Sequence, residues 1–335
     1  MDYAIRTNQI TKTYAGQKAV DSVSIQVPAG SVYGYLGANG AGKTTTIRML
    51  LSLIKAESGS IELLGKPVPA DYNRIAPKIG IVPGEVLLYE ELTGYEMLNY
   101  LQNFLKEPPV LRDQLINDFK FSQKDLHKKI RYYSQGMKQK ILLIQAMQHN
   151  PDLLIFDEPS EKLDPLMQNV FYDYISLFKK QEKTIFLSSH NLPEVEKVCD
   201  QIGIIKDGKL LVQDKIDYLK KQLPRLIKIR FKDDINAEDF NRDFLTIVHS
   251  SQNKLEIKIT GPLESLMDML QKYRALRYRI ALSKTFPLSR LANLCDTATL
   301  TPRFAFSPTV LRKARKVDRL LDITQTTMLT FLSSC

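Results

Sequence analysis

Hydrophobic and polar positions follow two periodicities along the first two hundred residues. Apolar runs typical of strands lie at residues 4–10, 22–27, 31–36, 60–64 and 79–83. The third run ends in a glycine cluster, and residues 43–54 after that cluster have apolar residues at helical spacing. Residues 93–148 are patterned mainly as helices, with a break at 107–109. Strands at 153–157, 184–188 and 202–206 then alternate with helices at 165–180 and 192–198. This alternation predicts a layered α/β core with a parallel sheet and a helical subdomain at about 88–150.

A second, smaller pattern follows a hairpin turn predicted at residues 206–209, which leads into a strand at 210–213. We place the first domain at residues 1–214, before a charged helix at 215–222 and Pro224. Strands at 226–231 and 254–260 alternate between apolar and polar positions, and 262–273 has helical spacing. These elements predict a small α+β accessory domain at 215–273, which stops before it is complete.

The positive charge is concentrated at the carboxyl end. The chain of 335 residues carries a net charge of +10, within an ordinary globular composition of 44% hydrophobic and 25% charged residues. Residues 274–335 hold 11 basic and only 3 acidic residues, so the rest is close to neutral. Two interpretations of this basic tail stay open: an arm for anionic lipid or nucleic acid, or a non-native or disordered end caused by a change of reading frame near Tyr273. The charge therefore gives no reason to expect a nucleic-acid partner.

Other bulk features exclude whole classes of protein. No apolar run reaches the roughly 18–20 residues of a membrane span, and the amino terminus lacks the pattern of a signal peptide. The three cysteines, Cys199, Cys295 and Cys335, are far apart and in no metal-binding spacing. We therefore expect a reduced, cytoplasmic protein.

A phosphate-binding loop is the most specific motif in the chain. Residues 37–44 match G-x-x-x-x-G-K-[ST], with a predicted strand before them and a predicted helix after them. In such a loop the backbone N–H groups point at phosphate oxygens, and the helix presents its positive end to the same anion. The lysine reaches the β- and γ-phosphates, and the threonine hydroxyl holds Mg²⁺. The expected nucleotide-binding positions are Gly37, Asn39, Gly40, Gly42, Lys43 and Thr44.

Two adjacent carboxylates, Asp157 and Glu158, follow the apolar strand at 153–157. Ligands bind at the carboxyl ends of parallel strands, so Asp157 is expected to complete the Mg²⁺ shell and Glu158 to polarise an attacking water. Alone, such a pair is more typical of a solvated strand end. The phosphate loop earlier in the chain favours the nucleotide site.

Four motifs in this order resemble the ABC ATPase family: the phosphate loop, residues 134–137 before a helix, residues 157–159, and residues 188–190. Residues 133–140 resemble the signature variant of ABC-2-type exporter subunits of the multidrug and bacitracin-export kind. The resemblance covers about residues 3–272. It implies a P-loop NTPase core with a β-rich subdomain and a helical insert, joined to the small α+β accessory domain.

The resemblance also implies roles for single residues. Tyr14 would stack on adenine, and Thr45 would join Lys43 and Thr44 at the phosphates and Mg²⁺. Glu158 would be the general base, and His190 would contact the γ-phosphate.

Further implied roles belong to a head-to-tail dimer, which we expect to be a homodimer. Ser134 and Gly136 would cover the γ-phosphate held by the second ATPase subunit, and Asp164 would communicate across the interface.

The function implied by the resemblance is an ATPase subunit that binds ATP and Mg²⁺ on the inner face of the cell membrane. It would drive separate integral membrane permease subunits of an exporter. Two alternatives stay open: a soluble, non-transport ABC ATPase, and a truncated subunit that binds ATP without coupling. Members of the repair class carry long heptad arms, and those of the translation class usually carry two ATPase units; neither feature is recognisable in this sequence.

Two positions depart from the family pattern. Gly84 stands where the family usually has Gln, and sometimes Glu, with Glu85 next to it. Glu161 and Lys162 stand where small residues are usual. The first departure puts the sensing of Mg²⁺ in question, and the second the geometry of the dimer interface.

Overall fold

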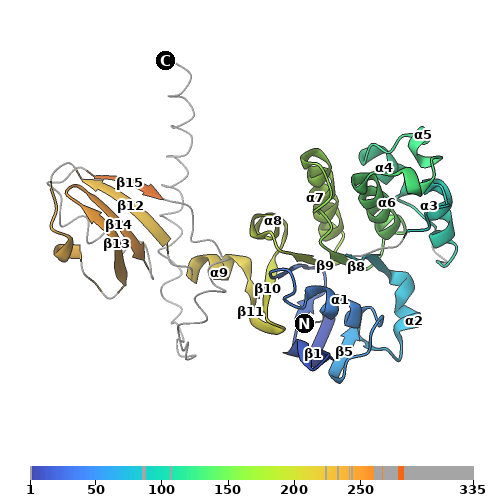
Figure 1. The fold of residues 1–335 in the computed structure, drawn as a ribbon, viewed down its shortest axis with the longest axis horizontal. Coiled ribbons are helices and arrows are strands. Elements are labelled where there is room, and N and C mark those ends of the chain that lie inside the picture. The colour runs from blue at the N-terminus through green and yellow to red at the C-terminus, as the bar shows by residue number, and fades with distance from the viewer. Residues whose placement is uncertain are drawn as a thin grey trace, which may run out of the picture. The chain divides into compact units, whose positions relative to one another are not determined.

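The structure is a computed structural model that describes residues 2–84, 88–105, 108–222, 225–231, 234–240, 242, 244–259, 266 and 278–282. Among them, six strands form the core sheet, in the order β11-β10-β4-β9-β8-β7 (Figure 1). Neighbouring strands from β10 to β7 run parallel, and β11 returns antiparallel beside β10. The strands are β4 (Val32–Leu36), β7 (Ile79–Val82), β8 (Leu153–Asp157), β9 (Thr184–Ser189), β10 (Gln201–Lys206) and β11 (Lys209–Lys215). The predicted parallel α/β core is confirmed.

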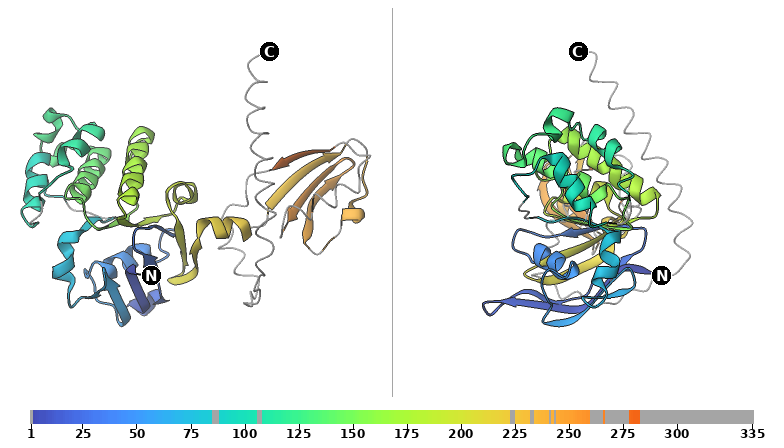
Figure 2. Two further views of the ribbon diagram at one scale, coloured as in Figure 1. Left: turned by 180° about the vertical axis from the view of Figure 1, so that it is seen from behind. Right: turned by 90° about the vertical axis from the view of Figure 1, so that its right-hand side faces the viewer.

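The core sheet is covered on both faces, which explains why its central strands are continuous apolar runs rather than alternating ones. All residues of β4, β8 and β9 are buried. On β8, Leu154 and Phe156 pack into the hydrophobic cluster of the helices, whereas Leu153 and Ile155 pack into the cluster of the antiparallel sheet. Figures 1 and 2 show the helices α6 (Gln135–Met147) and α7 (Pro165–Lys180) on one face of this sheet. In the same figures, the other face carries α1 (Lys43–Leu50) and the strands β1 (Tyr3–Tyr14) and β5 (Ser58–Leu63).

The antiparallel sheet holds the amino-terminal part of the chain against the core. Its order in the described residues is β2-β1-β5-β6, and β3 also pairs with β1. The strands are β1 (Tyr3–Tyr14), β2 (Gln17–Val23), β3 (Gln26–Pro28), β5 (Ser58–Leu63) and β6 (Lys66–Val68). The sequence pattern predicted one strand at 22–27, where the structure has the end of β2 and then β3, and it missed β6.

Helices agree with the predicted spacing at several points and differ at one. The bounds of α7 and of α8 (Leu192–Val198) coincide with the prediction. Helix α1 ends at Leu50 rather than near 54, because the chain turns into the left-handed region at Ser52, with a φ of 57°. The remaining helices are α2 (Tyr72–Ile75), α3 (Gly94–Gln102), α4 (Arg112–Asp118), α5 (Gln123–Leu126) and α9 (Ile216–Gln222), with 3₁₀ turns at Ala76–Lys78, Ile130–Tyr132 and Ala237–Phe240.

A separate antiparallel sheet forms the accessory region. Its order in the described residues is β13-β14-β12-β15, built from β12 (Arg225–Phe231), β13 (Leu245–Ser251), β14 (Lys254–Ile259) and β15 (Tyr278–Leu282). Ile227, Ile229 and Ile257 lie in its buried cluster. Strand β15 pairs with β12 and lies beyond residue 273, in the segment that the sequence assigned to the tail. Apart from Leu266, the helix predicted at 262–273 lies outside the described residues, as does 283–335.

Within the part of the chain that the structure describes, no helix is both long and apolar enough to cross a membrane.

Candidate functional site

The phosphate loop connects β4 to α1. Its glycines at 40 and 42 have φ values of 80° and 109°, in the left-handed region that favours glycine. A Cβ on Gly42 would lie 2.4 Å from the carbonyl oxygen of Ala19, so no larger residue fits there without movement. Asn39 and Gly40 are exposed, as is expected of groups that meet a ligand. Because the first turn of α1 has no acidic residue, its positive end is free to attract an anion.

The Lys43 side chain is only 6% exposed and folds back over this loop. Its ammonium donates to the carbonyl oxygens of Gly37 and Ala38, at 2.7 and 3.1 Å, and lies 3.2 Å from Glu158 Oε1. The loop thus places a buried cation beside its backbone N–H groups, and this combination suits a polyphosphate.

The carboxyl end of β8 meets the loop at Asp157. Thr44 Oγ1 donates to Asp157 Oδ2 at 2.7 Å, and Ser188 Oγ on β9 donates to Asp157 Oδ1. Asp157 is 2% exposed. One carboxylate and one hydroxyl oxygen side by side are the hard ligands that Mg²⁺ prefers, with the other positions left to phosphate oxygens and water. The residues predicted for Mg²⁺, Thr44 and Asp157, therefore fit this ion.

Glu158 turns sharply out of the strand. Its φ of 51° is in the left-handed region, which is costly for a residue other than glycine, and its N–H donates to Ser188 Oγ at 3.1 Å. The turn aims the carboxylate back at the loop, so that Oε1 faces Lys43 while Oε2 lies 3.0 Å from Nδ1 of His190 and 3.3 Å from its backbone N. The structure thus brings Lys43, Glu158 and His190 together as one cluster.

Ser188 is a site residue that the sequence did not single out, although it opens the motif at 188–190. It reaches both acidic residues because β9 lies between β4 and β8 in the sheet, with Ser188 opposite Asp157 in register. The signal available in the sequence was the pair of polar residues, Ser188 and Ser189, directly after the apolar residues 185–187 of the strand.

Other predicted residues lie elsewhere on the molecule, and no contact joins them to Lys43 or Glu158 in the described residues. Tyr14 is 46% exposed at the end of β1, and the Lys12 ammonium lies 5.6 Å from its ring centroid. Ser134 is exposed and caps α6 by accepting from the N–H of Met137 at 3.2 Å. Asp164 likewise caps α7.

Two further predicted residues are placed by their helices. Thr45 is half-buried in the first turn of α1. Gly136 lies at the start of α6, where a Cβ would lie 3.3 Å from the carbonyl oxygen of Lys162. The segment at 134–137 is therefore next to the loop that follows Glu158, and Gln139 Nε2 strengthens this link by donating to the Pro159 carbonyl at 2.8 Å.

Gly84, where the family usually has Gln, packs against the carboxylate of Asp157. A Cβ there would lie 2.7 Å from Asp157 Oδ2. Glu85, the expected substitute, lies outside the described residues.

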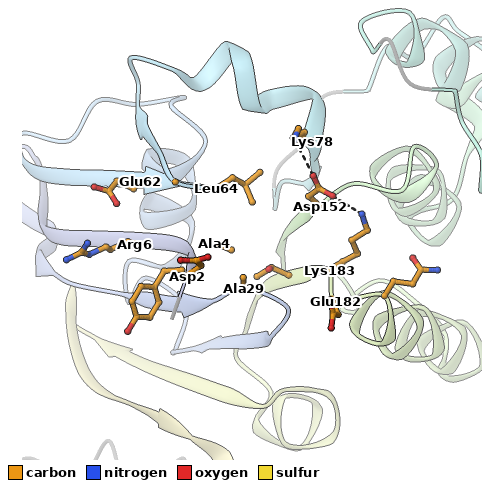
Figure 3. Close-up of a pocket in the computed structure, with 14 residues that line it drawn as sticks. Asp2, Ala4, Arg6, Ala29, Glu62, Leu64, Lys78, Asp152, Glu182 and Lys183 are labelled. Atoms are coloured by element: carbon orange, nitrogen blue, oxygen red, sulfur yellow. Dashed lines mark hydrogen bonds and ion pairs between the residues drawn. The ribbon is translucent and has the colours of Figure 1, made fainter.

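A hollow of about 770 Å³ lies at the opposite edge of the core sheet (Figure 3). Lys78, Asp152 and Thr184 place it at the amino ends of β7, β8 and β9. Lys78 and Lys183 converge on Asp152, at 3.7 and 2.7 Å, so these charges satisfy one another. No predicted site residue lines this hollow, and the candidate site remains at the carboxyl ends of the strands.

Comparison with known proteins agrees with this geometry. The family model described as ABC transporter matches residues 20–161. The bacitracin transport ATP-binding protein BcrA of Bacillus licheniformis is 35% identical over 301 residues, covering 81% of this chain and 97% of its own length. BcrA of Enterococcus faecalis is 34% identical over 223 residues, covering 66% of this chain and 72% of its own length.

Solved structures show the same fold. An ATP-binding subunit of an ABC transporter superposes with a TM-score of 0.61 at 27% identity, covering 65% of this chain and 92% of its own. A dimeric ATP-binding cassette in a post-hydrolysis state, bound to ADP and Pi, superposes with a TM-score of 0.56 at 19% identity. The match covers 63% of this chain and 98% of the cassette. The chain therefore belongs to the ABC transporter family and is one of its ATP-binding, ATP-hydrolysing subunits.

Proposed function

We propose that this subunit powers export across the cell membrane by ATP-driven, head-to-tail dimerisation of two copies. The observation that carries the proposal is the cluster of Lys43, Glu158 and His190 beside the Thr44–Asp157 pair. One copy supplies the groups that bind and hydrolyse the nucleotide. In its segment at 134–137, Ser134 and Gln135 are exposed, and the segment makes no hydrogen bond or ion pair with that cluster in the described residues, which suits a role toward the partner copy.

The roles that we propose for single residues combine the family resemblance with the contacts described above. Lys43 and the loop N–H groups bind the phosphates, with Thr45 beside them, and Tyr14 stacks on the adenine. Thr44 and Asp157 hold Mg²⁺, which neutralises phosphate charge when bound.

Glu158 and His190 carry out the hydrolytic step. Glu158 accepts a proton from the attacking water and is held for this by the N–H of His190 at 3.3 Å. The His190 ring contacts the γ-phosphate. Ser134 and Gly136 of the partner copy cover that phosphate, and Asp164 relays the contact between the two copies.

Relatives whose names state bacitracin transport support the transport role, and the resemblance of residues 133–140 to the signature of ABC-2-type exporter subunits supports the export direction. The permease would be a separate integral membrane protein, and the subunit would sit on the cytoplasmic face.

The hydrolytic role is tested with Glu158→Gln. We expect at least a roughly 100-fold loss of ATP turnover, with nucleotide binding retained and ATP-dependent dimers detected by light scattering. Glu182→Gln, at an exposed residue on the opposite edge of the core sheet, is the matched control and should leave turnover unchanged. Hydrolysis at the parental rate in Glu158→Gln would remove Glu158 from the mechanism.

The transport role is tested by purifying the tagged full chain from membranes. An integral membrane protein should co-purify and should raise ATP turnover when both are placed in vesicles. Turnover that is stimulated by nucleic acid, with no membrane partner, would instead support a soluble ABC ATPase.

A further inference from the structure

A buried carboxylate, Glu194 on α8, lies directly behind the hydrolytic cluster. It is 6% exposed, and both of its oxygens accept hydrogen bonds from serine hydroxyls. Ser160 Oγ donates to Oε1, and Ser189 Oγ donates to Oε2 at 2.7 Å. Carboxylates are almost never fully buried unless they are paired in this way.

The two serines belong to the two segments that carry the hydrolytic residues. Ser160 follows Glu158 by two residues, and Ser189 directly precedes His190. In front of them, Glu158 Oε2 joins the same segments through its contact with Nδ1 of His190 at 3.0 Å. The segments are thus joined through the Glu158 carboxylate and through Glu194, in addition to the hydrogen bond from the Glu158 N–H to Ser188 Oγ.

The carboxylate is kept at an energetic cost. Burial raises the pKa of Glu194, and the hydroxyls of Ser160 and Ser189 offset part of that rise. Glu158 also raises the pKa and His190 lowers it, and Tyr172 on α7 packs against the same group. An apolar residue would avoid the desolvation cost, so the gain has to lie in the geometry that the two hydrogen bonds impose.

We propose that Glu194 is a positioning residue for hydrolysis, which holds the loop after β8 and the loop after β9 at the separation that Glu158 and His190 require. This proposal rests on the proposed roles of Glu158 and His190. Misplacement of a catalytic group by about 1 Å can cost about 100-fold in rate. Nucleotide binding depends on the loop between β4 and α1, to which Glu194 makes no hydrogen bond or ion pair in the described residues. The Gly37 N–H of that loop donates to the carbonyl oxygen of Ser189 at 3.2 Å, a backbone link that does not involve the Glu194 side chain.

The loop at 158–164 has other anchors, so it is expected to stay folded without Glu194. Gln168 Nε2 on α7 donates to the carbonyl oxygen of Ser160 at 3.1 Å, and Gln139 Nε2 on α6 donates to that of Pro159 at 2.8 Å. A variant at 194 loses the hydrogen bonds to Ser160 and Ser189 and keeps the other hydrogen bonds between the two loops.

The test compares Glu194→Ala, Glu194→Gln and the matched control Glu196→Ala, which lies two residues further along α8. In the full chain, Glu194→Ala should lower kcat for ATP roughly tenfold or more and leave KM within about twofold. Glu194→Gln should recover most of kcat, because an amide can accept from one serine and donate to the other. Glu196→Ala should match the parent.

Ser160→Ala and Ser189→Ala each remove one tie and keep the carboxylate, so they decide the question even where Glu194→Ala does not fold. Each should lower kcat, and the effects should be non-additive with Glu194→Ala. Parental kcat in all three variants, or a loss confined to KM, would overturn the proposal. If Glu158→Gln abolishes turnover while these variants do not, only the positioning role fails; if Glu158→Gln keeps turnover, the proposed hydrolytic site fails.

Discussion

Replacement of Gly84 by alanine tests how tightly the proposed Mg²⁺ ligand Asp157 is packed. The added Cβ would lie 2.7 Å from Asp157 Oδ2 and 3.1 Å from its Cγ. The first distance is about 0.7 Å inside the 3.4 Å at which ordinary contacts begin. Either the carboxylate or the backbone at 84 therefore has to move.

The carboxylate is not free to move away. Its Oδ2 accepts from Thr44 at 2.7 Å, and its Oδ1 accepts from Ser188. Overpacking of this kind costs about 1–3 kcal/mol. Since every 1.4 kcal/mol is tenfold in an equilibrium constant, the Mg²⁺ concentration for half-maximal turnover should rise roughly 5-fold to 100-fold if the whole cost falls on this site.

The assay is ATP turnover of the full chain across a Mg²⁺ titration, with thermal unfolding measured in parallel. Pro83→Ala, which removes atoms at the neighbouring position, should leave the Mg²⁺ dependence unchanged. Gly84→Gln restores the residue usual in the family but carries the same Cβ, so we expect impairment rather than improvement. Unchanged Mg²⁺ dependence and unchanged unfolding temperature in Gly84→Ala would refute the reasoning.

Three further predictions concern other parts of the subunit. Burial lowers the pKa of His149 to about 4. Because the unfolded state therefore binds a proton that the folded state does not, the free energy of unfolding should fall by about 2 kcal/mol as the pH falls from 7.5 to 5. In denaturant titrations, His149→Leu should remove this contribution to the pH dependence. Arg112 donates to Gln148, Asn99 and the Leu98 carbonyl at 2.7, 2.6 and 3.2 Å, so Arg112→Ala should lower the free energy of unfolding by about 2 kcal/mol, and a loss below about 0.5 kcal/mol would contradict this. Tyr14→Ala should raise KM for ATP roughly 5-fold to 100-fold through lost stacking, whereas Tyr14→Phe should not, and equal KM values would exclude Tyr14 from the site.

The local pattern of apolar and polar residues predicted those elements in which buried residues form a continuous run or recur at regular spacing. Strand β8 and helices α7 and α8 have the predicted bounds, because long apolar runs and helical spacing are properties of consecutive residues. Strands β6 and β13 were missed because they are largely exposed, so their sequences show no alternation of apolar and polar positions.

By itself, the sequence determined the phosphate loop, the acidic strand end at Asp157 and Glu158, and the family to which the chain belongs. Each of these depends on residues that are neighbours along the chain. The tertiary structure decided which loops meet. Strand β9 lies between β4 and β8, so Ser188 reaches Asp157, and α8 packs so that Glu194 reaches Ser160 and Ser189. Strand order and helix packing arise from long-range burial, and no short sequence motif encodes such contacts.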